Sequence, residues 1–334
     1  MTGGQRVKAC VPLDIRHWAL VIGISLAIGI WPLLIPSLPF CDMKVVHTIE
    51  ECRQVRATLG KLAFVPTMGA LHDGHISLIR YGKQHADHVA TSIFVNPTQF
   101  GPREDFTKYP RPIEVDLKKC EEAGVELVFN PPPEEMYRSG EPPIIVDLPE
   151  LSTILEGKHR PGHFKGVCQV VAKLFNIVQP QVAMFGNKDF QQLRIIQAMT
   201  EALNFPIQIV GCPTVREKDG LAMSSRNQYL SPDERERALS ISRALMLASG
   251  EARAGVKQAN RLVATMQNLL LDPGNLGRVP VSIDYVAAVD ATTLKPVDVI
   301  TGPTVLAIAA RVGSTRLIDN MTIVPSEREI PKDK

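Results

Sequence analysis

Residues 62–75, LAFVPTMGALHDGH, have the pattern of a strand that turns directly into a helix. The first four residues form a short apolar run, and Ile76 and Ile79 then follow at helical spacing. Gly69 and Gly74 let the backbone pass close to a ligand, and the free N–H groups at the start of a helix favour a phosphate. The stretch predicts a strand–turn–helix unit whose histidines either contact phosphate or only cap the helix.

Strands and helices alternate along the chain after this unit. Residues 88–95 and 125–129 are rich in β-formers, and Ile113, Leu117 and Cys120 mark a helical face between them. Further helices are expected over 163–178 and 189–203, and further strands over 182–185 and 207–210. This order is typical of an α/β fold, a Rossmann-like doubly wound parallel sheet. Ligands of such sheets lie beyond the carboxyl ends of the strands, so we expect one crevice there.

A smaller α+β domain is expected in the C-terminal part of the chain. Ser231, Pro232 and Glu234 fit an N-cap, a first helical position and an N3 position, so they predict a helix to about Ser249. A second helix is expected over 257–271, and a small sheet from the β-rich runs 283–289, 305–310 and 321–324. The predicted division is an extension 1–42, a first domain 43–212 and a second domain 213–334.

The N-terminal extension differs in composition from the rest. Trp18–Phe40 contains no charged residue and is long enough to span a bilayer, with Arg6, Lys8 and Arg16 before it. Three prolines in its second half would break a helix. We favour an upstream extension from a mis-called start, or a tail, over a hydrophobic anchor, which stays as the alternative.

Composition limits the classes of function. The 334 residues carry 37 Lys and Arg against 35 Asp and Glu, a net charge of +2, so the broad basic face of a nucleic-acid-binding protein is not expected. The six cysteines are scattered without a C-x-x-C pair, which indicates neither a zinc site nor a disulfide framework. We expect reduced, mostly buried thiols.

Five segments together resemble one enzyme family. Residues 72–75, HDGH, resemble the H-x-G-H signature of nucleotidylyltransferases and class I aminoacyl-tRNA synthetases. Four more match in order: IFVNPTQF (93–100), RPGHFKGV (160–167), FGNKDFQQL (185–193) and KDGLAMSSRN (218–227). From about Met43 to the C-terminus the chain resembles the pantothenate synthetase family. The resemblance implies condensation of (R)-pantoate with β-alanine, driven by ATP through a pantoyl adenylate, with AMP and pyrophosphate released, in coenzyme A precursor biosynthesis.

The resemblance also implies a role for each matching residue. His72 and His75 would donate to the triphosphate, with His75 as the usual proton donor, and Lys188 would complete the catalytic set. We expect the two histidines to titrate near neutral pH. The implied ATP-binding residues are Met68, Gly69, Ala70, Leu71, His72, Asp73, Gly74, His75, Gly186, Asn187, Lys188, Asp189, Val215, Met223, Ser224, Ser225 and Arg226. The implied pantoate- and β-alanine-binding residues are Gln99, Gln192 and Asn96.

The remaining expectations concern partners and alternatives. Mg²⁺ should arrive with ATP, without a dedicated cage of protein carboxylates. A homodimer, a cytoplasmic location and a C-terminal domain that closes as a lid are implied by the resemblance. His163 is interpreted as a cap of the following helix. Two other functions stay open: a nucleotidylyltransferase that releases its nucleotide bound to the product, and a membrane-anchored ATP-binding protein without catalysis.

Overall fold

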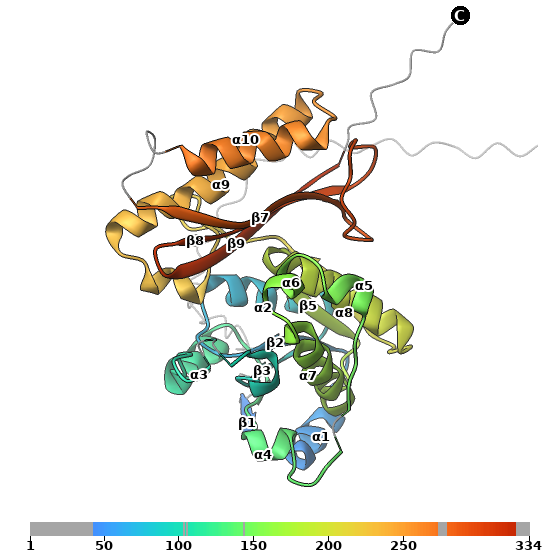
Figure 1. Cartoon of the computed structure of the whole chain (residues 1–334). Helices are drawn as coiled ribbons and strands as arrows, with labels where there is room; N and C mark the ends of the chain where they lie inside the picture. The colour runs from blue at the N-terminus through green and yellow to red at the C-terminus, as the bar shows by residue number, and fades with distance from the viewer. Residues whose placement is uncertain (1–42, 103, 105, 143, 273–278, 325–334) are drawn as a thin grey trace, which may run out of the picture. The chain divides into compact units, whose positions relative to one another are not determined.

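The computed structural model describes residues 43–102, 104, 106–142, 144–272 and 279–324 (Figure 1). The predicted extension 1–42, with its possible anchor, lies outside the described residues. Within the described residues, no helix is both long enough and apolar enough to cross a bilayer.

The first part of the described chain is built on a six-stranded parallel sheet with the order β1-β4-β3-β2-β5-β6. Its strands are β1 (Lys44–Val46), β2 (Leu62–Thr67), β3 (His88–Ile93), β4 (Leu127–Phe129), β5 (Val182–Gly186) and β6 (Gln208–Cys212). Successive strands run outward from β2 to β4 on one side, and the later strands β5 and β6 lie on the other. The strand order therefore reverses between β2 and β5, as in a doubly wound fold, which confirms the predicted fold class.

Helices cover both faces of this sheet. The main ones are α1 (Ile49–Ala57), α2 (Asp73–His85), α3 (Ile113–Glu122), α7 (His163–Val178) and α8 (Phe190–Ala202). Alternate residues of β2 face opposite ways: Leu62 and Phe64 pack in the core with α1 and α7, whereas Ala63 and Val65 pack in the core with α2. A strand buried on both faces needs an uninterrupted apolar sequence, which is the pattern that identified β2.

Short helical segments connect these elements. They are η1 (Pro97–Gln99), α4 (Pro133–Met136), α5 (Pro149–Ser152), α6 (Glu156–His159), η2 (Asn187–Asp189) and η3 (Ser225–Tyr229). Two of them, η1 and η2, lie close behind the carboxyl ends of β3 and β5, so they place polar side chains at the edge where a ligand is expected.

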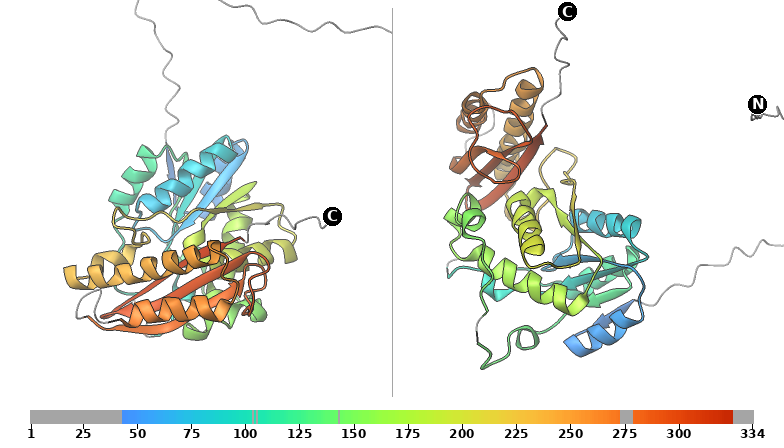
Figure 2. Two further views of the ribbon diagram at one scale, coloured as in Figure 1. Left: turned by 90° about the horizontal axis from the view of Figure 1, so that it is seen from above. Right: turned by 90° about the vertical axis from the view of Figure 1, so that its right-hand side faces the viewer.

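The C-terminal part is an antiparallel sheet covered by two helices, as predicted (Figure 2). Its elements are α9 (Pro232–Arg253), α10 (Ala259–Leu271), β7 (Val281–Asp290), β8 (Thr304–Val312) and β9 (Thr315–Ile323). Ser231 caps α9 in a capping box with Glu234, although the helix runs four residues beyond the predicted end. The predicted start of the last strand, at residue 321, is wrong. Strand β9 begins at Thr315 and includes the polar residues Asp319 and Asn320, which interrupt the β-rich pattern because they bind other loops.

The cysteines of the described chain are reduced and buried, as predicted. Cys52, Cys120, Cys168 and Cys212 are free thiols, whereas Cys10 and Cys41 lie outside the described residues. Burial raises the pKa of the Cys168 thiol to about 12, so this side chain is a neutral core residue at physiological pH.

Candidate active site

A cavity of about 250 Å³ opens at the carboxyl ends of β2 and β5, where the strand order reverses. Predicted site residues that line it are Met68, His72, Gly74, His75, Asn96, Gln99, Gly186, Lys188, Asp189, Gln192, Val215, Met223, Ser224, Ser225 and Arg226. The predicted residues Gly69, Ala70, Leu71, Asp73 and Asn187 do not line this cavity. The structure thus brings together segments from four separate parts of the chain, including both predicted glutamines.

The turn after β2 is held by a buried carboxylate of α3. Asp116, only 1% exposed, accepts hydrogen bonds of 2.7 Å from the backbone N–H groups of Ala70 and Leu71. Gly69 has φ of +84°, and a Cβ there would lie 3.0 Å from Asp116 Oδ2. The N–H groups of Ala70 and Leu71 are therefore engaged within the protein, and this turn positions the following histidines without presenting all its own donors to the cavity.

The two histidines cap the helix, as one interpretation of the sequence predicts, and they also line the cavity. Nδ1 of His72 accepts from Gly74 N–H at 3.2 Å, and Nδ1 of His75 accepts from His72 N–H at 3.3 Å. Because a backbone N–H can only donate, Nδ1 is unprotonated in each ring, and a neutral ring then carries its proton on Nε2. The ring centroids are 4.1 Å apart. The capping contacts fix the tautomer that leaves two Nε2–H donors.

The two histidines do not titrate near neutral pH, contrary to the expectation from the sequence. Burial, reinforced by the charge of Lys188, lowers the pKa of His72 to about 4. Burial and the neighbouring His72 and Lys188 lower the pKa of His75 to about 3. Both effects disfavour an imidazolium, because a charged ring loses hydration and meets positive neighbours. At neutral pH these side chains are neutral hydrogen-bond donors.

The cationic side of the cavity comes from two loops. Lys188 lies in η2, where its side chain is 20% exposed and its Nζ is 3.8 Å from Asp189 Oδ2. The second loop carries Met223, whose sulfur accepts from Gly74 N–H at 3.3 Å, so the loop touches the start of α2. Ser224 caps η3 by accepting from Arg226 N–H. Two cationic side chains and two hydroxyls, from Lys188, Arg226, Ser224 and Ser225, therefore line the same cavity as the histidines.

The amide groups form the other end of the site. Asn96, 1% exposed, donates from Nδ2 to Gln99 Oε1 and to Gly166 O, each at 3.1 Å. Tyr137 donates its hydroxyl to Asn96 Oδ1 at 2.7 Å. Both ends of the Asn96 amide are thus engaged, and this residue holds Gln99 in place. Gln192, in the first turn of α8, lines the same cavity.

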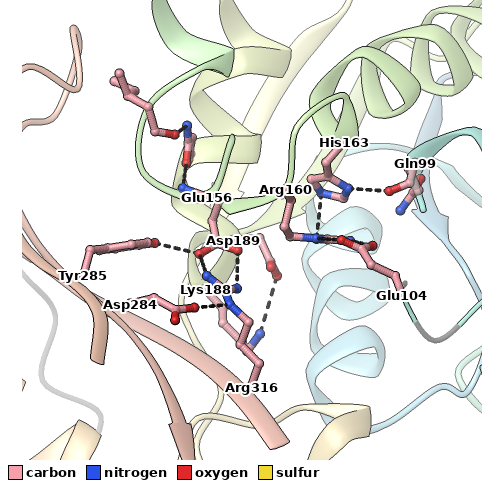
Figure 3. A network of polar contacts seen from close by, with 12 residues as sticks. Gln99, Glu104, Glu156, Arg160, His163, Lys188, Asp189, Asp284, Tyr285 and Arg316 are labelled. Atoms are coloured by element: carbon pink, nitrogen blue, oxygen red, sulfur yellow. Dashed lines mark hydrogen bonds and ion pairs between the residues drawn. The ribbon is translucent and has the colours of Figure 1, made fainter. Parts of the chain in front are cut away.

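His163 does not cap α7, contrary to the sequence interpretation, because the N-cap is Gly162 and the imidazole points elsewhere. Its Nδ1 bonds to Gln99 O at 2.8 Å and its Nε2 to Arg160 Nη1 at 3.0 Å (Figure 3). A guanidinium only donates, so Nε2 accepts and Nδ1–H donates to the Gln99 carbonyl. Arg160 is fixed in turn by Glu104 through contacts of 2.6 and 2.7 Å. The result is a continuous polar chain that supports Gln99.

A second cavity, of about 660 Å³, lies between the Lys188 loop and the C-terminal sheet. Arg316 of β9 forms a bidentate pair with Glu156, at 2.6 and 2.8 Å, and donates to Asp284 at 2.6 Å (Figure 3). Tyr285 donates its hydroxyl to the same Glu156 carboxylate at 3.0 Å. The two cavities share Lys188, Gln192 and Arg226. They form neighbouring parts of one cleft.

Sequence reasoning missed several residues that support the site. Asp116 had a readable signal, because it lies on the same helical face as the apolar residues Ile113, Leu117 and Cys120, where an unpaired charge is not expected. Tyr137 and Asn320 had no signal in the sequence, because folding alone brings each of them to its partner. The Tyr137–Asn96 contact spans 41 residues, and the contacts of Asn320 span up to 133.

Comparison with known proteins decides the family. The family model described as pantoate-beta-alanine ligase matches residues 44–322. The chain belongs to the pantoate-β-alanine ligase family. A pantothenate synthetase of Syntrophotalea carbinolica is 50% identical over 281 residues, covering 84% of this chain and 97% of that protein. One of Sulfurihydrogenibium sp. is 52% identical over 261 residues, covering 78% and 91%.

Solved structures agree with this membership. Pantothenate synthetase of Thermus thermophilus superimposes with a TM-score of 0.78 and 42% identity, covering 85% of this chain and all of that one. Pantoate-β-alanine ligase of Francisella tularensis, solved with β-γ ATP and β-alanine, has a TM-score of 0.68 and 32% identity, covering 84% and 97%.

Family membership selects among the functions left open by the sequence. A pantoate-β-alanine ligase is an enzyme of pantothenate biosynthesis, so the ligase class predicted from the sequence is confirmed. A nucleotidylyltransferase that keeps the nucleotide in its product, and an ATP-binding protein without catalysis, are no longer alternatives. The roles of single residues stay predictions.

Proposed function

We propose that this chain condenses (R)-pantoate with β-alanine to give pantothenate through a bound pantoyl adenylate. The observation that carries this mechanism is the meeting, around one cavity, of the His72 and His75 donors with Lys188 and the Met223–Arg226 segment, while Gln99 and Gln192 line the same space. This arrangement offers a place for a polyanion beside a place for a small hydroxy acid. The presence of β-γ ATP and β-alanine in the Francisella relative supports it.

The first step joins two anions. A pantoate carboxylate oxygen attacks the α-phosphorus of ATP, and the bond to the leaving pyrophosphate breaks. Donors that neutralise the charge growing on the phosphoryl oxygens lower this barrier, commonly by ~3 kcal/mol for one well-placed donor. Binding both reactants in line supplies much of the remaining gain. In the second step the amine of β-alanine attacks the activated carbonyl carbon, AMP leaves, and the amine gives up a proton.

The histidines act in this scheme as neutral donors. Their Nε2–H groups bond to phosphate oxygens, and His75 is the donor assigned to the transition state. A triphosphate beside these rings opposes the lowering of their pKa by burial and by Lys188, because the anion stabilises the imidazolium form. His75 thus stays a neutral hydrogen-bond donor unless bound phosphate groups raise its pKa.

The other phosphate contacts come from the two loops. Lys188 and Arg226 supply positive charge, and Ser224 and Ser225 supply hydroxyls to the β- and γ-phosphates. The adenine lies by the backbone of Val215, and Gly186 lets the backbone approach the nucleotide. Since a guanidinium binds phosphate through two N–H groups at once, Arg226 holds the pyrophosphate end in a defined orientation.

Pantoate is assigned to the amide end of the cavity. Gln99 and Gln192 bind its hydroxyl and carboxylate groups, and Gln99 also meets β-alanine. Asn96 contributes by fixing the Gln99 side chain. Apolar neighbours such as Val171 and Leu174 of α7 suit the branched carbon skeleton.

Mg²⁺ is assigned to the substrate, as the complex that it forms with ATP. No cluster of three or more His, Cys, Asp or Glu side chains able to hold a metal occurs among the described residues. We assign most ligands of this ion to phosphate oxygens and water, because Mg²⁺ prefers a partly hydrated octahedral shell. We assign no step of the reaction to a protein-bound metal.

We propose the following domains, oligomeric state and location for a chain that makes pantothenate. Residues 43–212 bind ATP and pantoate, and residues 213–334 form a lid domain. A homodimer, action in the cytoplasm and no nucleic-acid partner complete the proposal. The net charge of +2 supports the last point, because nucleic-acid binding needs a strong basic face.

The decisive experiment incubates the protein with Mg²⁺, ATP, pantoate and β-alanine, omits each in turn, and identifies the products by mass. All four should give pantothenate, AMP and pyrophosphate. Without β-alanine, pantoyl adenylate should stay bound to the enzyme. Release of ADP and phosphate would instead require an acyl phosphate and would refute the adenylate mechanism.

A further inference from the structure

The two loops that carry the groups assigned to phosphate contact are separated in the sequence by helix α8 and strand β6. Lys188 follows β5, whereas Met223–Arg226 follows β6 after a turn. The distance between these groups therefore depends on whatever holds both loops. Strand β9 of the C-terminal sheet contacts both of them through two adjacent side chains, Asp319 and Asn320.

Asn320 holds the Lys188 loop. Its Nδ2 donates to the carbonyl oxygen of Asn187 at 2.9 Å and to that of Lys188 at 2.7 Å. A primary amide has two N–H donors, so these bonds use both of them. The side chain is 8% exposed, which protects the bonds from competing water. The backbone of Lys188 is thus fixed from the C-terminal sheet.

Asp319 holds the other loop. Its two carboxylate oxygens accept from Arg216 at 2.6 and 3.1 Å, and the carboxylate is 4% exposed. Arg216 also donates to Gly220 O, at the tip of the turn in this loop. Arg216 pairs with Ala222 across an antiparallel bridge, and Val215 O accepts from Met223 N–H at 3.0 Å. The bidentate pair therefore anchors the segment that continues into Ser224.

Successive side chains of a strand project to opposite faces, and neighbouring Cα atoms are a fixed distance apart. Two loops bound to adjacent residues of one strand are consequently held at a fixed separation. We propose that Asp319 and Asn320 are positioning residues that set the spacing between Lys188 and Ser224–Arg226 across the triphosphate. This inference rests on the proposed function of those groups in ATP binding.

The experiment measures the single-turnover rate of pantoyl adenylate formation, followed as pyrophosphate release. Asn320→Ala should slow this step roughly tenfold, as expected for the loss of two amide–carbonyl bonds, without changing the KM for pantoate. Asn320→Asp should be slower still, because its oxygens would face two carbonyl oxygens. The double variant Lys188→Ala/Asn320→Ala should be no slower than Lys188→Ala alone, since Asn320 acts through Lys188.

Controls separate positioning from stability and from the proposed function. Thr322→Ala, at an exposed position of the same strand, should leave the rate unchanged. A rate within twofold of wild type for Asn320→Ala, or additive effects in the double variant, would overturn the inference even if the melting temperature fell. If Lys188→Ala itself reacted normally, the proposed role of Lys188 would fail instead. If Asn320→Ala failed to fold, Asn320→Asp would decide by the same criteria.

Discussion

The two sides of the cleft contain contacts that differ greatly in sequence separation. At the carboxyl ends of β2 and β3, His72 and His75 bond to each other across three residues of sequence, and Asn96 bonds to Gln99 across three. On the side of the C-terminal sheet, the Arg316–Glu156 pair spans 160 residues and the Asn320–Lys188 contact spans 132. The contacts between His72 and His75 and between Asn96 and Gln99 are local, whereas the contacts on the side of the C-terminal sheet join distant parts of the chain. Substitutions of the groups assigned to substrate contact should therefore affect mainly catalysis, whereas substitutions in the long-range Arg316–Glu156 pair should affect mainly stability.

The largest effect on stability is expected from the Arg316–Glu156 pair. Arg316→Ala leaves the Glu156 carboxylate, 7% exposed, without its guanidinium, and removing one partner of a buried pair commonly costs about 3–5 kcal/mol. Urea unfolding measures the loss. Arg311→Ala is the matched control, because Arg311 lies opposite Arg316 in the β8–β9 register but is exposed. If Arg316→Ala and Arg311→Ala had the same free energy of unfolding, the Arg316–Glu156 pair would not stabilise this side of the cleft.

The largest effect on catalysis is expected at the histidines and at Lys188. His75→Ala and Lys188→Ala should each slow adenylate formation by about a hundredfold or more, because each removes a donor worth ~3 kcal/mol in the transition state. Both should retain the fold by circular dichroism. His85→Ala, at the other end of α2, is the control and should react normally. A near-normal single-turnover rate for either variant would remove its assigned role.

Acid should destabilise the protein through its buried histidines. Burial lowers the pKa of His163 to about 4, as it does for His72, whereas the unfolded chain titrates near 6.5. Between these values the unfolded state binds more protons, so the stability present above pH 6.5 is lost as the pH falls toward 4. Each histidine should contribute of the order of 2 kcal/mol to this loss. Urea unfolding from pH 7.5 to 4.5 tests the slope, and a flat profile would contradict the low pKa values.

A smaller and more selective effect is expected from two adjacent glutamines. Gln192→Ala should raise the KM for pantoate roughly tenfold and leave the KM for ATP unchanged, because only pantoate loses an amide bond. Gln191 instead bonds to Glu156 N–H, Leu151 O and Ile154 O. Gln191→Ala should therefore lower stability and spare pantoate binding. Steady-state kinetics and thermal melting of both variants distinguish pantoate binding from stability. If Gln191→Ala raised the KM for pantoate and Gln192→Ala lowered only the melting temperature, the two assigned roles would be exchanged.

No effect on turnover is expected from removal of residues 1–42. A chain that starts at Met43 retains every residue assigned to chemistry, and the match to the family model begins at residue 44. It should make pantothenate at the rate of the full chain in the same assay. A fall in kcat would give residues 1–42 a part in catalysis. Fractionation of the native host tests the membrane alternative, since an anchored chain would resist salt and alkaline washing of the membranes.

The sequence determined the parts that depend on local pattern. The apolar run of β2, the glycines after it and the two histidines predicted a strand–turn–helix unit, and the fold class followed from the alternation of strands and helices. Capping signals located the start of α9, because a cap depends on residues three positions apart. The family resemblance added Gln99, Gln192 and Lys188, which do line the cavity.

Only the tertiary structure decided how the site is supported and charged. Burial and positive neighbours keep His72 and His75 neutral, although an isolated histidine would titrate near neutrality. Asn320 is an ordinary polar residue in the sequence, and it reaches Lys188 because two distant parts of the chain pack together. Pattern analysis detects periodicity over a few residues, whereas desolvation and long-range hydrogen bonds arise only once the chain is folded. For that reason the sequence predicted which side chains contact the substrates, and the structure identified the residues that hold them.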